Sequence, residues 1–265
     1  MSREEIISRK LFKRLVMTFL YGQKKGGHKK ALVAALADRN YEFVVDEIED
    51  EGKPTPIYRV ERHRLKAIDL PEGQLDYFVD LVRAAIERQL PGAVDVMNFV
   101  RTIAKALAEA GKALKWVSLS GVPVCNLEHK PDVHSVKLWL DDRPAYHEVS
   151  TEWLPEIDVA ACVRSSAPNL VHSCDAAHLA LVALACECEH IPLACVHDSF
   201  ATLPCHADKM REILLRELRD MYRDRNLLQE IHDYASHELP AATLPPVPAP
   251  RGLDLDQVTG PYAFA

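Results

Sequence analysis

Basic and aromatic side chains recur at intervals of four residues near the amino terminus, and they define a first candidate site. The residues are Arg9, Lys13, Met17 and Tyr21. In a helix each step of four turns by only ~40° and rises ~6 Å, so these side chains share one slowly winding face ~18 Å long. A planar Arg fork and a compact Lys charge suit neighbouring phosphates, and Lys can also release a proton. The face therefore fits a nucleotide; the alternative is an ordinary solvated basic helix.

A single carboxylate, Asp198, supplies the second candidate site. Segment 191–204 (IPLACVHDSFATLP) has apolar arms on either side of His197, Asp198 and Ser199, as expected of two strands joined by a tight turn. A carboxylate at the tip of rigid strands suits a hard cation such as Mg²⁺. One carboxylate is not a complete metal site, so the alternative is a turn aspartate that hydrogen-bonds its own backbone.

The seven cysteines are weaker candidates for chemistry. Their number is odd and no C-x-x-C pair occurs, so we expect reduced and largely buried thiols. Cys186, Cys188 and His190 are spaced too tightly for a usual structural zinc site. No feature of the sequence identifies an activated cysteine nucleophile.

The composition is that of a globular protein, because the 265 residues are 48% hydrophobic and 27% charged. No run of ~18 apolar residues occurs and the amino terminus lacks the apolar stretch of a secretory signal. We therefore expect a cytoplasmic protein without membrane contact. The net charge is −7, yet residues 1–30 carry nine Lys/Arg and only two Glu. Positive charge is thus concentrated around the first candidate site, where it can attract phosphates.

Apolar spacing predicts the elements of the first half. Residues 4–22 should form a helix with one apolar stripe that ends at Gly22, and residues 30–66 should be a charged excursion with short strand-like pieces. Residues 72–89 and 93–110 have helical spacing, with Gly111 as the stop signal for the second of these helices.

The second half alternates strand and helix patterns. A hairpin is expected around Ser120–Gly121 and strand character over residues 137–148. Ser173 is expected to cap a helix that covers residues 176–188, on which Val182 and Cys186 share a buried face. A further amphipathic helix over residues 207–222 precedes a Pro-rich linker at residues 240–250.

Three segments together are similar to motifs of single-subunit RNA polymerases of the phage and mitochondrial type. RKLFKRLVMTFLYG (residues 9–22) resembles their fingers helix, and APNLVHSCDAAHL (167–179) and VHDSFATLP (196–204) follow in the family's order. The final YAFA resembles the aromatic carboxy terminus of the phage enzymes. The resemblance implies a mostly helical α+β fold: the fingers and a partial palm of the right-hand polymerase fold, with the catalytic hairpin.

The same resemblance divides the chain into four expected segments. Residues 1–30 would be the nucleotide-binding fingers helix, and residues 31–111 the remaining fingers helices and an insertion. Residues 112–222 would be the palm-like segment with the HDS hairpin. Residues 223–265 would contain a C-terminal helix, the Pro-rich linker and a terminal foot, with Phe264 and Ala265 packed near the site.

The resemblance implies a role for five residues in DNA-directed RNA synthesis, in which a ribonucleotidyl group is transferred to the RNA 3′-hydroxyl. Arg9 and Lys13 would hold the triphosphate, and Lys13 is a candidate proton donor to the pyrophosphate. Tyr21 would lie beside the ribose and, with His172, help to recognise the 2′-hydroxyl, while Asp198 would bind catalytic Mg²⁺. The implied partners are a DNA template, the RNA product and ribonucleoside triphosphates.

One carboxylate that the family requires is missing from the sequence. The other metal-binding aspartate of the family belongs to a D-x-S-G segment upstream of the fingers helix, and no such segment occurs here. One aspartate cannot bridge two metal ions and align the attacking hydroxyl. The expectation is therefore a carboxy-terminal polymerase piece that is inactive alone and requires an upstream polypeptide, in the host cytoplasm if it is phage-encoded or else in the mitochondrial matrix.

Two rival interpretations remain open. The chain could be a non-catalytic nucleotide- or nucleic-acid-binding module, or a relic of such a polymerase. A DNA polymerase fragment is disfavoured, because the related DNA polymerases typically have Glu after the His-Asp pair, whereas Ser199 follows Asp198 here, and because His172 is present.

Overall fold

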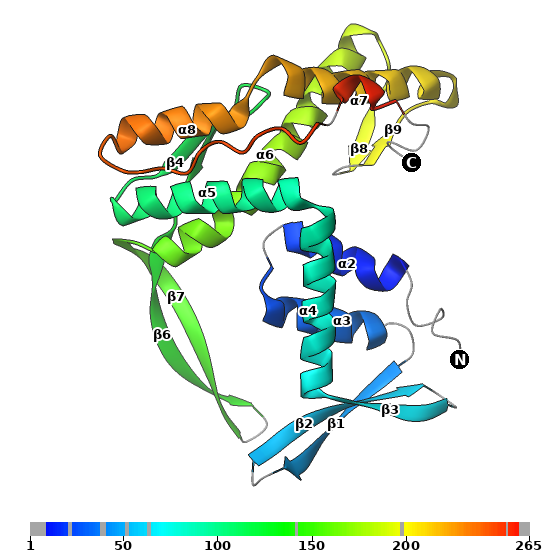
Figure 1. The fold of residues 1–265 in the computed structure, drawn as a ribbon, viewed down its shortest axis with the longest axis vertical. Coiled ribbons are helices and arrows are strands. Elements are labelled where there is room, and N and C mark those ends of the chain that lie inside the picture. The colour runs from blue at the N-terminus through cyan, green and yellow to red at the C-terminus, as the bar shows by residue number, and fades with distance from the viewer. Residues whose placement is uncertain are drawn as a thin grey trace. The chain divides into compact units, whose positions relative to one another are not determined.

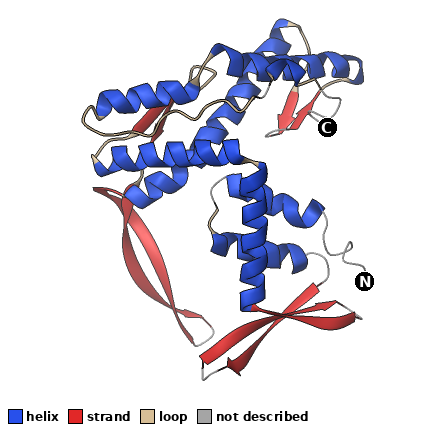
Figure 2. Ribbon diagram, viewed as in Figure 1, coloured by secondary structure: helices blue, strands red, loops and turns tan. Residues whose placement is uncertain are grey.

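The protein is a mostly helical α+β chain, as predicted, and it is seen in a computed structural model (Figures 1 and 2). The structure describes residues 9–20, 23–37, 41–50, 53–62, 65–140, 143–196, 199–252 and 254–259. The chain forms two compact units, Met1–Met97 and Asn98–Ala265, and α5 (Pro91–Glu109) contains the boundary between them. Each unit is described by itself.

The first unit combines helices with a small antiparallel sheet. Its helices are α2 (Arg9–Leu20), α3 (Lys25–Ala37) and α4 (Glu72–Gln89). Its sheet has the order β1-β2-β3, with β1 at Tyr41–Asp50, β2 at Lys53–Arg62 and β3 at Leu65–Pro71. The strand-like pieces predicted within residues 30–66 are thus confirmed, as parts of strands longer than the predicted pieces.

The core of the first unit lies where α2, α3 and α4 meet. Its buried members are Leu15, Ala31, Leu32, Leu75 and Val79. The predicted stripe on the first helix is confirmed where the side chains are described, because Leu15 and Phe19 are only 1% and 4% exposed. Burial of this stripe against two other helices stabilises α2 more than its intrinsic helix propensity does.

Helix α3 was not predicted. Gly26 and Gly27 stand in its first turn, and each glycine costs a helix about 1 kcal/mol relative to alanine, which is why the sequence indicates a break there. Burial of His28, Ala31 and Leu32 on its inner face stabilises the helix in spite of the glycines. Tertiary packing has overridden the local preference.

Helices α4 and α5 match their predicted spans closely. Pro91 is the first residue of α5, a position where the missing N–H costs nothing. Val100, Ile103 and Leu107 are fully buried along α5. Gly111, predicted as the stop signal, has φ +74° and lets the N–H of Lys112 donate to the Leu107 carbonyl at 2.9 Å.

The second unit consists of antiparallel pairs of strands and helices. The strands are β4 (Leu114–Val117), β5 (Pro123–Asn126), β6 (His129–Leu140), β7 (Arg143–Ile157), β8 (Ala194–Val196) and β9 (Ser199–Ala201). They pair as β4-β5, β6-β7 and β8-β9. The helices are α6 (Val159–Cys188), α7 (Ala207–Asp224) and α8 (Leu227–Glu238), with short 3₁₀ turns η1 (Pro204–His206) and η2 (Leu255–Gln257).

Most elements predicted for the second unit are confirmed. The hairpin at Ser120–Gly121 joins β4 to β5, with Gly121 at φ +90°. The strand predicted over residues 137–148 is the outer part of the long β6-β7 ribbon. The helix at residues 207–222 is α7, the C-terminal helix is α8, and the Pro-rich residues 240–250 belong to no helix or strand.

The predicted cap at Ser173 is wrong. Helix α6 begins 14 residues earlier and contains Pro168 as well as Ser173. Its true cap is Asp158, whose Oδ1 accepts the N–H of Ala161 at 2.8 Å. The Ser173 hydroxyl instead donates to the Leu170 carbonyl at 2.7 Å, a bond to the preceding turn that is compatible with a helix interior.

Length and composition alone would let α6 cross a membrane. Its contacts in the protein are those of a central helix of a globular unit, because it packs against α7 and β5. Val182 and Cys186 of the predicted face are fully buried. These contacts place one face of α6 in the core of the second unit.

The cysteines are less buried than predicted. All seven are free thiols, but only Cys162 and Cys186 are buried, Cys174 is half-buried, and the remaining four are exposed, namely Cys125, Cys188, Cys195 and Cys205. The exposed ones lie in short strands, at a helix end or in a 3₁₀ turn, where an apolar neighbourhood in sequence does not become a core in space.

Candidate active site

The predicted phosphate-binding face lies on α2, opposite the buried stripe. Lys13 is exposed and Met17 is 46% exposed, whereas Leu15 and Phe19 face the core. Arg9 is the first residue of α2, but its side chain is outside the description, and Tyr21 lies outside the described residues. The described part of the face is therefore accessible to a ligand, while Leu15 and Phe19 on the opposite side anchor α2 to the core.

The chain that leaves α2 is held by Arg83 of α4. The Nη1 atom of Arg83 donates to the Gln23 carbonyl at 3.0 Å and also lies 3.0 Å from Nδ1 of His28. The guanidinium carbon lies 5.1 Å from the ring centre of Phe19, within range of a cation–π interaction. The Phe19 and His28 rings are stacked at 6.0 Å. Sequence reasoning did not find this cluster, because Arg83 lies at least 55 positions along the chain from each of its partners.

The chemistry of Arg83 determines the state of His28. Arginine can only donate, so Nδ1 of His28 must accept and the proton of the neutral ring must be on Nε2. Burial lowers the pKa of His28 below its usual value, and the adjacent Arg83 charge lowers it further. A neutral His28 can remain stacked on Phe19 beside the arginine without charge repulsion.

The two strands predicted within residues 191–204 are present as the β8-β9 pair. Val196 pairs with Ser199 and Cys195 with Phe200. His197 and Asp198 follow Val196 in the sequence and lie outside the described residues. The predicted arms are confirmed, while the metal-binding role of Asp198 stays a prediction.

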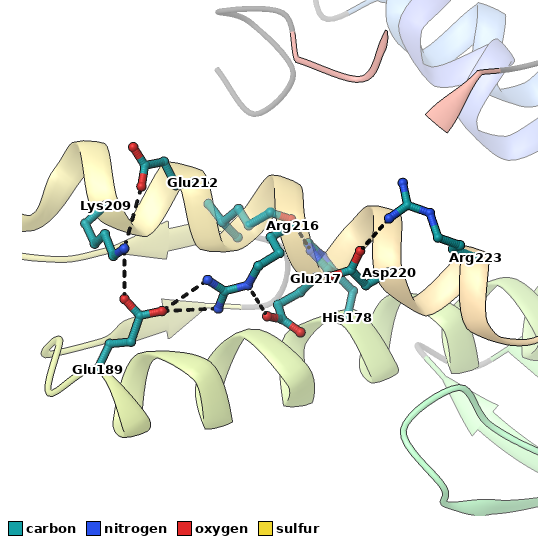
Figure 3. Close-up of polar contacts among 9 residues, drawn as sticks. His178, Glu189, Lys209, Glu212, Arg216, Glu217, Asp220 and Arg223 are labelled. Carbon is teal, nitrogen blue, oxygen red and sulfur yellow. Dashed lines mark hydrogen bonds and ion pairs between the residues drawn. The ribbon is translucent and has the colours of Figure 1, made fainter. Parts of the chain in front are cut away.

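The β8-β9 hairpin packs against α6 and α7 through Phe200. This ring packs against the buried cluster of Val182, Cys186, Ile191, Ile213 and Leu214. It also meets the ring of His178 edge-on, with centroids 5.9 Å apart. Figure 3 shows His178 reaching from α6 towards α7, where its Nε2 donates to the Leu214 carbonyl at 3.0 Å. His178 of α6 thus contacts both α7 and β9.

An ion-pair network joins the end of α6 to α7 beside the hairpin (Figure 3). Oε1 of Glu189 is 3.2 Å from Nη1 and Nη2 of Arg216, and Oε2 is 3.2 Å from Nζ of Lys209. Nε of Arg216 also donates to Glu217 at 3.0 Å. Hydrogen bonds from Lys209 and Arg216 hold the pKa of Glu189 below its usual value. The carboxylate therefore remains charged and paired where the hairpin leaves α6.

The end of α6 has a Schellman geometry with a histidine at the left-handed position. His190 has φ +55°, and its N–H donates to the Glu187 carbonyl at 3.0 Å. The N–H of Ile191 donates to the Cys186 carbonyl at 2.8 Å, and both side chains belong to the same buried cluster. This turn fixes the direction in which the chain enters the hairpin.

His172, the predicted ribose-contacting residue, is exposed on α6. The next residue is braced from β4, because Trp116 Nε1 donates to the Ser173 hydroxyl at 3.0 Å. Asn126 of β5 binds the same helix one turn earlier, where its Oδ1 accepts from Asn169 at 2.7 Å. The strands β4 and β5 thus fix the part of α6 that carries His172.

The predicted site residues fall in both units. Arg9, Lys13 and Tyr21 belong to the first unit, and His172 and Asp198 to the second. Sequence reasoning missed His178, although it lies in the family-like segment 167–179, six residues after His172. Within the described part of the chain no three His, Cys, Asp or Glu side chains gather as metal ligands, and Asp198 is not part of that set.

Comparison with known proteins identifies the family. The sequence profile of the DNA-dependent RNA polymerases matches residues 1–248. The DNA-directed RNA polymerase of Pseudomonas phage phiKMV is 31% identical over 203 residues, which are 74% of this chain and 24% of that protein. The Arabidopsis thaliana DNA-directed RNA polymerase 2, chloroplastic/mitochondrial, is 27% identical over 97% of this chain and 23% of that protein.

A third relative covers a different share of its own length. The DNA-directed RNA polymerase 2A of Nicotiana tabacum is 24% identical over 97% of this chain and 69% of that protein. The chain thus spans about a quarter of the phage and Arabidopsis relatives, at 24% and 23% of their lengths. The matched region contains the α2 face, the hairpin and α6, and we conclude that the chain belongs to the phage-type, single-subunit family of DNA-dependent RNA polymerases.

Proposed function

We propose that this chain supplies the fingers and part of the palm of a DNA-directed RNA polymerase. The observation that carries the proposal is the family match over residues 1–248, which includes all five predicted site residues. Residues 1–111 would form the fingers, and residues 112–222 the palm-like segment with the hairpin. The substrates would be ribonucleoside triphosphates, with a DNA template and an RNA 3′-end as nucleic-acid partners.

The reaction is phosphoryl transfer from a triphosphate to a hydroxyl. The RNA 3′-oxygen forms a bond to the α-phosphorus, the bond from that phosphorus to the bridging oxygen breaks, and pyrophosphate leaves. Arg9 and Lys13 hold the triphosphate, and Lys13 gives a proton to the departing pyrophosphate. The exposure of Lys13 on a helix fixed by Leu15 and Phe19 supports this role.

The sugar would be recognised by Tyr21 and His172. Tyr21 follows the last residue of α2, directly beyond the phosphate-binding face. His172 is exposed on a part of α6 that Trp116 and Asn126 contact at Ser173 and Asn169. A rigid support of this kind is what discrimination between a hydroxyl and a hydrogen requires.

Asp198, which stands between β8 and β9 in the sequence, would bind Mg²⁺. Its carboxylate offers hard oxygen ligands, which fit this cation, and bound Mg²⁺ would neutralise the charge that develops on the phosphates. The packing of half-buried Phe200 on the buried cluster and against His178 supports a fixed position for β9. A second carboxylate is required, and we propose that an upstream polymerase polypeptide supplies it.

The decisive experiment measures Mg²⁺-dependent ribonucleotide incorporation on a primed template. The chain is assayed alone and mixed with an upstream polymerase fragment that carries a D-x-S-G segment. Activity in the mixture only, abolished by D198N, is the expected result. Activity of the chain alone would contradict the need for a partner.

A second candidate function is binding without catalysis. The exposed Lys13 on α2 would serve such binding as well as it would serve catalysis. A chain that binds ribonucleoside triphosphates or a template duplex, but never supports incorporation in the mixture, would establish this alternative.

A further inference from the structure

A groove on the surface of the second unit lies between the β4-β5 hairpin and α8, the helix that packs along β4 (Figure 1). Its volume is about 550 Å³, which is within the range of small-molecule sites. All of its lining residues belong to the described part of the second unit, and none of them is a predicted catalytic residue. Binding in this groove is therefore independent of the proposed polymerase reaction.

The β4-β5 hairpin contributes one wall of the groove through its outward-facing side chains. Lys115 is directly opposite Cys125 in the ladder, and Val117 is directly opposite Pro123, so each pair lies on one face of the hairpin. All four residues are exposed. Trp116, between the two β4 positions, is buried, as the period of two in a strand requires. Apart from a thiol, the Lys115 ammonium group is the polar feature of this wall.

Helix α8 contributes the other wall, and the polar atoms of that wall are already bonded. The Tyr234 hydroxyl donates to the Ala113 carbonyl at 2.9 Å, so the tyrosine offers its ring to the groove. Glu230, one turn earlier, accepts from Nε and Nη2 of Arg225 at 3.0 and 2.5 Å. Arg225 also donates from Nη1 to the Ser118 carbonyl at 2.6 Å. The charge of Glu230 is thus balanced within the protein.

Lys115 carries the one unbalanced charge among the lining residues. Within the described part of the chain its ammonium group makes no ion pair or hydrogen bond, whereas Glu230 is paired with Arg225. A single cation beside apolar walls is complementary to a ligand that has an anionic end and an apolar body. The Tyr234 ring favours an aromatic body, because two rings gain from an offset or edge-on contact beyond the burial of their area.

We propose that the groove binds small aromatic carboxylates, with the carboxylate paired to Lys115 and the ring packed against Tyr234. A neutral ligand would leave the ammonium group without a counter-charge, and an aromatic amine would be repelled by it. The Cys125 thiol lies opposite Lys115 in the ladder. A bound carboxylate therefore covers this thiol and hinders its modification.

The exposed Cys125 makes the binding measurable in the full chain. Alkylation by N-ethylmaleimide is followed by mass spectrometry with and without 3-phenylpropionate, and the ratio of the two rates at each cysteine gives the protection of that thiol. Cys188, Cys195 and Cys205 are also exposed but do not line the groove, so they serve as internal controls. We expect millimolar 3-phenylpropionate to protect Cys125 and to leave the other three unprotected.

Two comparisons isolate the role of the charge. The neutral 3-phenylpropanamide should protect Cys125 roughly two- to five-fold less well than the carboxylate, the effect of a partly exposed ion pair, and 3-phenylpropylamine should not protect it. K115M keeps an apolar stem and should reduce protection by the carboxylate to the level of the amide. K105M removes an equal charge from an exposed position of α5 and should match the wild type.

Thermal melting confirms that both variants fold, and the ratio of rates cancels any effect of Lys115 on the intrinsic reactivity of the thiol. Absence of protection at Cys125, or equal protection of all four exposed thiols, would overturn the proposal. Equal protection by the carboxylate and the amide would also overturn it, as would undiminished protection in K115M, because Lys115 would then play no part in binding.

Discussion

Asn169 of α6 donates from Nδ2 to Oδ1 of Asn126 on β5 at 2.7 Å, and Asn126 is almost completely buried. The same Asn126 donates to the Cys162 carbonyl at 3.0 Å and accepts from the Ser165 hydroxyl at 3.0 Å. One side chain therefore binds α6 on both sides of Pro168, where the helix lacks an internal hydrogen bond.

We expect N126A to lower the free energy of unfolding of the second unit by about 1–3 kcal/mol, because it leaves the half-buried Asn169 amide and the Cys162 carbonyl without their partner. Chemical denaturation followed by Trp fluorescence measures this, since Trp116, Trp139 and Trp153 all belong to that unit. K115A, at an exposed position of β4, serves as a control within the same region. An N126A variant as stable as the wild type would show that the network contributes nothing.

His28 should make the first unit sensitive to acid. Its native pKa is lowered from 6.5, chiefly by burial and then by Arg83, so the unfolded chain binds a proton more readily than the native chain. Stability from this group is fully present above pH 6.5 and declines as the pH falls through 6.5 towards the native pKa. Hydrogen exchange of residues 23–37 between pH 7.5 and 5 reports on it.

The matched variant for this test is H28Q, which keeps an acceptor for Arg83 and does not titrate. Its exchange, once corrected for the intrinsic effect of pH, should be flat between pH 7.5 and 5. A wild-type profile as flat as that of H28Q would contradict a lowered pKa for His28.

The left-handed residue at the end of α6 can be improved. His190 has φ +55°, a conformation that costs an L-residue about 1–2 kcal/mol. Glycine avoids this cost, but it loses more chain entropy on folding, which offsets part of the gain. We expect H190G to raise the free energy of unfolding by up to about 1 kcal/mol. Gly111, at φ +74°, supplies the opposite case, because G111A should destabilise by about 1–2 kcal/mol. Equal signs for the two changes would refute the argument from backbone strain.

His178 should support the hairpin through its hydrogen bond to α7 and its contact with Phe200. We expect H178F to cost about 1–3 kcal/mol, because the Leu214 carbonyl loses its donor in a buried position. Exchange at β8 and β9 should rise with it, since the ring that Phe200 meets edge-on is no longer held to α7 by a hydrogen bond. H172F changes the exposed histidine of the same helix and should leave hairpin exchange unchanged. Equal effects of the two variants would argue against a specific support by His178.

The sequence predicted those elements whose own pattern decides the structure. The stripe of Leu15 and Phe19, the stop at Gly111 and the β8-β9 arms each follow from local spacing and are confirmed. Ser173 misled because a serine before an aspartate is typical of a cap, while its hydroxyl can equally bond within a helix. Packing, not local preference, decides between the two.

The supporting contacts of the candidate site could not be predicted from local patterns. Arg83 meets Gln23 and His28 across 60 and 55 residues, and Asn126 meets Asn169 across 43. Spacing within a segment predicts which residues share a face, but it does not reveal which distant side chain will hold that face. The roles of Lys13, Tyr21, His172 and Asp198 remain predictions from the resemblance.

Helix α6 connects the β6-β7 ribbon to the β8-β9 pair. Its 30 residues span ~45 Å. It starts at Asp158, whose N–H is held by Glu128 beside the base of the β6-β7 ribbon, and it ends at Glu189, directly before the β8-β9 segment. A displacement at the base of the ribbon would be transmitted along α6 towards β8, and the helix is least stiff at Pro168, where one internal hydrogen bond is missing. Because Asn126 contacts the helix on both sides of Pro168, it would limit bending at that point.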